Sequence, residues 1–91
     1  MDSHTKLTFF DYCKLAKSEY NKLLLVHPEI SALSTRELEV FGKLLTDKTL
    51  SEIAEEHYIT YSAVRFHCKN IYKKLGVSNR KQIYIKYKDL Y

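Results

Sequence analysis

Apolar residues recur at steps of three and four over most of the chain, which is the period of amphipathic α-helices. The clearest case is a set of four apolar residues that share one helix face at about 100° per residue, namely Val64, Cys68, Ile71 and Leu75. Polar and basic residues occupy the opposite face. With the residues before it, this pattern predicts a short helix, a tight turn, a long helix and a glycine stop within residues 49–77.

Side-chain caps mark where the predicted helices start. Capping boxes of the type Ser/Thr-x-x-Glu begin at Ser34 and Thr49. Thr60 and Asn79 supply two further caps, and Gly76 supplies the left-handed stop of the long helix. We therefore expect helices over about 34–46, 49–57, 60–75 and 79–90.

The first 32 residues form an N-terminal helical extension, and residues 33–91 form the domain proper. The helical pattern of the extension runs from Thr8 to about Val26, and Pro28 ends it. Two interpretations stay open for this helix: it packs on the domain or on a second copy, or it is a docking site for a separate regulator. With two glycines and one proline in 91 residues, we expect an all-α fold of four helices preceded by this additional helix.

Positive charge is concentrated at the end of the chain. From Thr60 onward there are eight basic residues and one acidic residue, whereas the whole chain has a net charge of +4. Such a field favours a polyanionic partner, nucleic acid first and an anionic membrane second. A solvated, lysine-rich surface explains the same composition equally well.

Other kinds of site have little support in the sequence. Cys13 and Cys68 are far apart and have no ligand spacing, and the four histidines are scattered, so we predict reduced thiols and no metal or other cofactor. The longest aliphatic run, residues 23–26, is far too short to span a membrane, and no signal peptide precedes it. There is no nucleophile motif, paired-carboxylate cleft or phosphate-binding glycine loop. We expect a cytoplasmic protein without enzymatic activity.

A short helix, a three-residue turn and a helix with a basic outer face form a helix-turn-helix. An α-helix fits the major groove of DNA, where its exposed side chains must bond base edges while neighbours neutralise phosphates. Ser62, Arg65, Lys69 and Lys73 form the polar stripe at steps of three and four. By pattern alone, many helix pairs in bundles look similar.

Beyond this pattern, residues from Leu33 to about Tyr87 resemble the LuxR-type (GerE-like) helix-turn-helix family, which also supplies the output domain of NarL/FixJ-type response regulators. The matching residues are Leu33-Ser34-x-Arg36-Glu37-x-Glu39-Val40, Glu52-Ile53-Ala54, Ile59-Thr60, Val64-Arg65-x-His67, Asn70-Ile71, Lys74-Leu75-Gly76-Val77 and Asn79-Arg80. The resemblance implies a four-helix domain that binds DNA as a dimer, usually through the last helix.

The resemblance also implies roles for individual residues. The family's base-reading positions fall on Arg65, Phe66 and Lys69. Candidate phosphate contacts are Thr60, Tyr61, Ser62, Lys73, Lys74 and Arg80, with Lys81 a weaker one. The candidate dimer interface comprises Tyr84, Ile85, Tyr87, Lys88 and Tyr91.

For three residues a structural role is an alternative to a role in binding. Phe66 either touches a thymine methyl or helps to hold the helix, and His67 either settles the helix or contacts DNA. Ile85 is either part of a partner surface or a lone surface isoleucine.

The chain departs from the family pattern at four positions. Tyr58 stands where glycine is common, and tyrosine costs about 1 kcal/mol or more there if the turn needs a positive φ. Ala63 replaces a common threonine, and Asp47 replaces a common glycine. Phe66 is larger than the usual aliphatic residue. Ala63 and Phe66 suggest a different or weaker operator preference.

We therefore expect a transcriptional regulator that binds double-stranded DNA sequence-specifically as a homodimer, with a recognition helix at about 61–75 in the major groove. The alternative is a protein-interaction module that forms heterodimers with another LuxR-type regulator and sequesters it.

Overall fold

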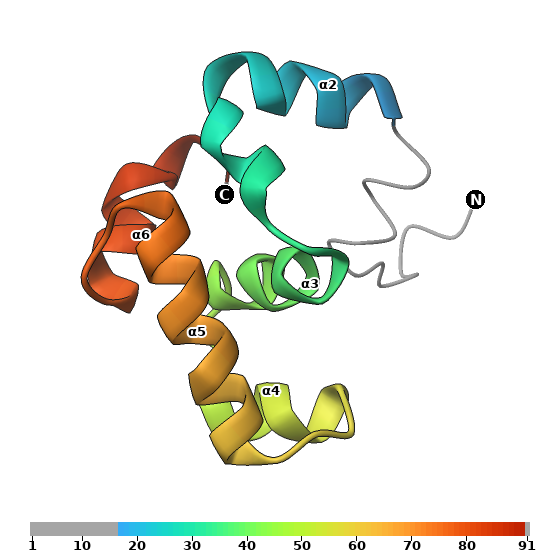
Figure 1. The fold of residues 1–91 in the computed structure, drawn as a ribbon, viewed down its shortest axis with the longest axis vertical. Coiled ribbons are helices and arrows are strands. Elements are labelled where there is room, and N and C mark those ends of the chain that lie inside the picture. The colour runs from blue at the N-terminus through green and yellow to red at the C-terminus, as the bar shows by residue number, and fades with distance from the viewer. Residues whose placement is uncertain (1–16, 91) are drawn as a thin grey trace.

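The computed structural model of the chain describes residues 17–90, with side chains from residue 21 onward (Figure 1). Its α-helices are α2 (Lys17–Val26), α3 (Thr35–Leu44), α4 (Leu50–Glu56), α5 (Tyr61–Leu75) and α6 (Arg80–Lys86). Two 3₁₀ turns, η1 (Pro28–Ala32) and η2 (Lys88–Leu90), follow α2 and α6. The predicted all-α class, with four helices after an N-terminal one, is confirmed. The predicted part of the first helix before Lys17 lies outside the described residues.

Both predicted capping boxes are present. The Glu37 amide donates to Ser34 Oγ over 3.2 Å, and Glu37 Oε1 accepts from the Ser34 amide over 2.9 Å. The box between Thr49 and Glu52 has the same two bonds at 3.1 and 2.8 Å. These bonds satisfy amides that have no partner within the helix, so the starts of α3 and α4 are fixed locally.

One hydrophobic core lies where α5 crosses α3 and α4 (Figure 1). The apolar face predicted for α5 is buried in full. The core residues are Ile30, Leu38, Val40, Phe41, Leu44, Ile53, Ala54, Val64, Cys68, Ile71, Leu75, Ile83 and Tyr87. Burial of the inner face of α5 leaves its opposite face to solvent, which positions the candidate site.

The N-terminal extension shares this core. Ile30 in η1 is fully buried, although it precedes the domain boundary that the sequence suggested after residue 32. Leu24 of α2 is partly buried against the same cluster. By contrast, Leu25 and Val26 are 84% and 66% exposed, so the end of α2 leaves two apolar side chains at the surface.

The end of the chain packs against η1. The Tyr87 ring lies edge-on to Phe41 with centroids 5.2 Å apart, and its hydroxyl donates to Glu29 Oε2 over 2.7 Å. His27 Nε2 lies 3.1 Å from the Asp89 carboxylate. The backbone leaves the α-helical conformation at Tyr87 (φ −115°, ψ 28°), so the last helix ends at Lys86 and not near Leu90 as expected.

Candidate nucleic-acid interface

Both ends of α5 are held firmly. At its start, Thr60 Oγ1 accepts from the Ala63 amide over 3.0 Å, as predicted. At its end, Gly76 adopts φ 72°, the left-handed conformation predicted for the stop. Lys86 Nζ also donates to the Leu75 carbonyl over 2.6 Å. A cation there complements the negative end of the helix dipole. This second contact comes from α6, and no pattern along the chain indicates it.

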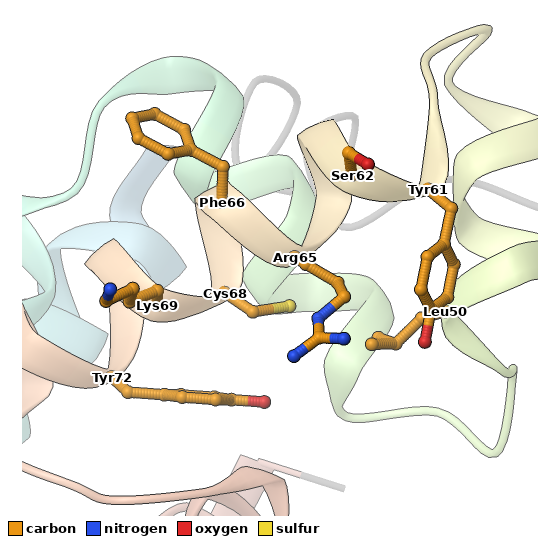
Figure 2. A pocket seen from close by; sticks show the side chains of 8 residues that line it. All are labelled: Leu50, Tyr61, Ser62, Arg65, Phe66, Cys68, Lys69 and Tyr72. Carbon is orange, nitrogen blue, oxygen red and sulfur yellow. The ribbon is translucent and has the colours of Figure 1, made fainter.

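The three predicted base-reading side chains all lie on the exposed face of α5. Arg65 and Lys69 are exposed, and Phe66 is 63% exposed, so its ring does not pack into the core. Figure 2 shows the Arg65 guanidinium and the Phe66 ring on different sides of the helix. The face therefore offers charged donors on one side and an apolar ring on the other.

An open hollow lies beside this face (Figure 2). Arg65 extends into it between the rings of Tyr61 and Tyr72, and Leu50 of α4 forms its far wall. Cys68 lies at its floor and is 3% exposed, and burial raises the pKa of this thiol. The hollow thus places the Arg65 guanidinium close to two tyrosine rings at the surface.

The predicted phosphate contacts divide into two groups. Thr60, Tyr61, Ser62 and Lys73 are exposed around the start and along the outer face of α5. Thr60 Oγ1 serves as a cap acceptor and keeps its own hydrogen available to donate. These four side chains remain placed for a polyanion.

Lys74 and Arg80 instead hold helices together. Lys74 Nζ donates to Glu37 Oε1 over 2.7 Å, which connects α5 to α3. The Arg80 guanidinium donates to the Leu44 carbonyl over 3.2 Å and to the Thr46 carbonyl over 2.7 Å. The predicted phosphate role of these two residues therefore competes with contacts inside the domain.

Glu37 is ionised in this arrangement. Burial alone would raise its pKa, but hydrogen bonds from Lys74 and from the Ser34 backbone outweigh burial and hold the pKa below 4.5. Its residue exposure is 6%, the one charged residue buried among those the structure describes. A carboxylate in that position needs its partners, so the pair fixes the orientation of the last turn of α5.

The turn between α4 and α5 carries backbone strain. Tyr58 adopts φ 55°, and its side chain is 95% exposed. The left-handed conformation disfavours residues with a Cβ by about 1–2 kcal/mol. The turn thus has the positive φ on which the cost of a tyrosine at this position depends, and the exposed side chain gains no burial to offset the strain.

The candidate dimer face on α6 needs one correction. Ile85 is 61% exposed and Lys88 is exposed, as a contact surface requires. Tyr84 is half-buried and donates to the Thr46 carbonyl over 2.6 Å. Tyr87 is fully buried inside the domain, so it offers no surface to a partner. Tyr91 lies outside the described residues.

Within residues 17–90, no group of three or more His, Cys, Asp or Glu side chains is arranged to hold a metal ion. No described helix is long and apolar enough to cross a membrane.

His67 is half-buried, and its ring meets Phe66 with centroids 5.9 Å apart.

Residues 31–87 match the sequence model of the family described as bacterial regulatory proteins, luxR family. The spore germination protein GerE of Bacillus subtilis (strain 168) is 50% identical over 50 residues, which are 55% of this chain and 68% of that protein. The probable transcriptional regulatory protein SgaR of Hyphomicrobium methylovorum is 42% identical over 57 residues, 63% of this chain and 27% of that protein.

A third relative is longer still. The probable transcriptional regulatory protein NarL of Mycobacterium tuberculosis (strain CDC 1551 / Oshkosh) is 40% identical over 53 residues, 58% of this chain and 24% of that protein. The chain thus spans about two thirds of the Bacillus protein and about a quarter of the other two. No solved structure matches it significantly.

Proposed function

The chain belongs to the luxR family of bacterial regulatory proteins, and on that basis we propose that this DNA-binding regulator recognises specific double-stranded DNA sites through α5. The family is one of regulatory proteins and not of enzymes. A regulator of transcription acts at the chromosome, so we place the protein in the cytoplasm. We propose no cofactor for DNA recognition by this protein.

The observation that carries the proposal is the rigid presentation of Arg65 and Lys69 on the outer face of α5. The helix is capped at both ends and buried along its inner face, so these two side chains point outward from a fixed frame. A guanidinium pairs with the two acceptors on the major-groove edge of guanine, and an ammonium serves one or both of them. The exposed ring of Phe66 is suited to a thymine methyl group.

Neighbouring side chains would set the register on the DNA backbone. We assign this role to Thr60, Tyr61, Ser62 and Lys73, which are exposed around the same face. Their hydroxyl and ammonium groups are donors that phosphate oxygens accept without regard to sequence. Lys74 and Arg80 are left out of the set because their cationic groups already bond to α3 and to the segment that follows it.

We further propose that two copies bind together, through a face of α6 that contains Ile85. This side chain and Lys88 are exposed and Tyr84 is half-exposed beside them, whereas Tyr87 is excluded by its burial. A two-fold dimer would present two α5 helices to half-sites about 34–36 Å, or one helical turn, apart. Selection from random DNA with the purified chain should then recover an inverted repeat.

The sequence-reading claim is tested by titrating the selected site and a scrambled duplex at several salt concentrations. Arg65→Ala with Lys69→Ala should abolish the preference for the selected site and leave salt-sensitive binding to any duplex. Lys73→Ala is the matched control, because loss of a phosphate contact should weaken both duplexes alike. Full site preference in the Arg65→Ala, Lys69→Ala protein would refute the assignment of α5 as the reading helix.

A protein-interaction role is the second candidate, and the exposed Leu25 and Val26 on α2 favour it. In that role the chain would pair with another regulator of the luxR family and sequester it from DNA. Light scattering combined with the DNA titration separates the two functions. A stable dimer that ignores every duplex at low salt would support sequestration and contradict DNA recognition.

A further inference from the structure

His57 occupies a joint between the two helices that support α5. It is the C-terminal cap of α4, and its side chain reaches the first turn of α3. There Arg36 Nη1 lies 3.0 Å from His57 Nδ1. The two residues are 21 positions apart, so this contact fastens the end of α4 to the start of α3.

The contact fixes the protonation state of the ring. A guanidinium only donates, so His57 Nδ1 must be the acceptor and carries no hydrogen. The ring hydrogen of neutral His57 then lies on Nε2. That atom is buried, and in the part of the chain that the structure describes it has no hydrogen-bond partner. The geometry therefore requires a neutral imidazole.

Burial and the charges around His57 also favour its neutral form. Burial, and next the positive charge of Arg36, lower the pKa of His57 from its ordinary value of 6.5. Lys43 adds to the lowering, while Glu39 and Glu56 oppose it. Both carboxylates are partly neutralised, since Glu39 lies 3.5 Å from Arg36 and Glu56 lies 2.9 Å from Lys43.

The residues that follow His57 connect this joint to α5. Tyr58 is held at φ 55°, and the Ile59 amide donates to the Ala54 carbonyl over 3.1 Å. Thr60 then starts α5. A strained residue stays in place only where its surroundings hold it there. The contact between Arg36 and His57 holds the end of α4 immediately before this turn, beside the ion pairs of Glu56 with Lys43 and Lys48.

We propose that neutral His57 is a positioning residue for α5, and that its protonation loosens the joint and weakens DNA binding as the pH falls below its ordinary titration range. The binding part of this proposal rests on the proposed function. Protonation removes the acceptor that Arg36 uses and places two positive charges about a hydrogen bond apart. The support of the turn, and with it the angle at which α5 is presented, then weakens.

The direction of the pH effect follows from proton binding. A histidine with a lowered pKa binds fewer protons in the folded than in the unfolded chain, so stability rises with pH between the folded pKa and 6.5. The contribution of His57 is complete above 6.5 and is lost as the pH falls from there through the folded pKa.

The test of the joint itself needs no DNA. Ring resonances of His57 are followed by NMR in the wild-type chain and in Arg36→Gln, and unfolding is compared across pH 7.5 to 5 with His57→Gln. We expect His57 to titrate below 6.5 and the Arg36→Gln substitution to raise its midpoint. His57→Gln keeps an acceptor for Arg36 without titrating, so stability should fall less on acidification than in the wild type. A His57 midpoint at or above 6.5, or equal slopes, would overturn the proposal.

A second experiment measures the affinity of the wild type and of His57→Gln for the selected duplex at pH 7.5 and 5.5. All other histidines are common to wild type and His57→Gln, so their effects on DNA cancel in the comparison. The wild type should lose at least about threefold more affinity than His57→Gln, since each unit of pKa shift is a tenfold change in an equilibrium. Equal losses would refute the coupling to DNA even if the NMR result stands. Absence of specific binding at either pH would refute the proposed function and this coupling together, and would leave the measured His57 midpoint to decide the role within the fold.

Discussion

Lys74 Nζ lies 2.7 Å from Glu37 Oε1, so the last turn of α5 is bonded to the capping box that starts α3. One carboxylate oxygen thereby serves two purposes, since it also accepts from the Ser34 amide. The lysine stands among basic residues that favour DNA, yet its charge is used within the domain. The pair makes the orientation of α5 depend on a contact that joins residues 37 positions apart.

We expect Glu37→Gln to lower the free energy of unfolding at pH 7 by about 1–3 kcal/mol. Glutamine retains an acceptor for the Ser34 amide but leaves Lys74 without a counter-charge, and the partial exposure of Lys74 keeps the loss below that of a fully buried pair. Urea denaturation measures the change. Glu52→Gln is the control, because exposed Glu52 makes the same cap contact at Thr49. Equal losses in the two variants would show that the ion pair adds nothing.

The stability difference between wild type and Glu37→Gln should also depend on pH. The pKa of Glu37 is held below 4.5, so the folded chain binds fewer protons than the unfolded chain as the pH falls through 4.5. The stabilisation is complete above 4.5 and is lost below it. Thermal unfolding measured between pH 7 and pH 3 should show the stabilities of wild type and Glu37→Gln converging as the pH approaches 3. A stability difference that stays constant over this range would contradict an ionised Glu37.

Substituting Arg80 and Lys73 in turn should distinguish a cation that stabilises the fold from a cation that contacts DNA. Arg80→Ala removes donors to the Leu44 and Thr46 carbonyls and should cost about 1–2 kcal/mol of stability. It should leave the salt dependence of DNA binding unchanged. Lys73→Ala should change stability by no more than about 0.5 kcal/mol and reduce the salt slope by about 0.9. The reverse outcome would return Arg80 to the phosphate contacts.

Tyr87→Phe should destabilise the chain by about 1–3 kcal/mol, because the half-buried Glu29 carboxylate loses a donor inside the domain. Hydrogen exchange should quicken in η1 in particular. Tyr84→Phe is the matched control, since its hydroxyl bonds to an exposed carbonyl at Thr46 and should be lost at smaller cost. If Tyr87→Phe leaves η1 as protected as in the wild type, the hydroxyl contact does not hold the extension.

Tyr58→Gly should raise the free energy of unfolding by about 1 kcal/mol, because glycine adopts a positive φ without steric cost. The exposed ring of Tyr58 gives up little by its removal. Tyr58→Ala separates the backbone effect from loss of the ring, since alanine keeps the Cβ and should give no such gain. Chemical denaturation of both variants provides the comparison.

The sequence predicted what depends on neighbours along the chain. Capping boxes join residues three apart, and the buried face of α5 follows from apolar residues at steps of three and four. Both features can therefore be predicted from the sequence. The contacts of Lys74, Lys86 and Arg36 join separate helices, and a pattern within one helix holds no information about them. The family resemblance assigns Arg80 to phosphate, but it does not reveal that the Arg80 guanidinium bonds to carbonyls of an earlier segment.

Tyr87 shows the same limit for apolar residues. The step of four residues from Ile83 to Tyr87 indicates a shared apolar side, and both side chains are buried. The period does not reveal whether such a side meets another copy or the chain's own earlier segment. In the structure that segment is η1, and the tyrosine is covered by it.

The buried side chain of Ile30 makes η1 part of the same packed core as α5. A polypeptide trimmed to start at the first capping box would omit this side chain and leave an opening beside α5, against which η1 lies. Biochemical work on an isolated DNA-binding fragment should therefore retain η1, from Pro28 onward. For the same reason, a partner that displaced η1 would disturb the packing on the inner side of α5.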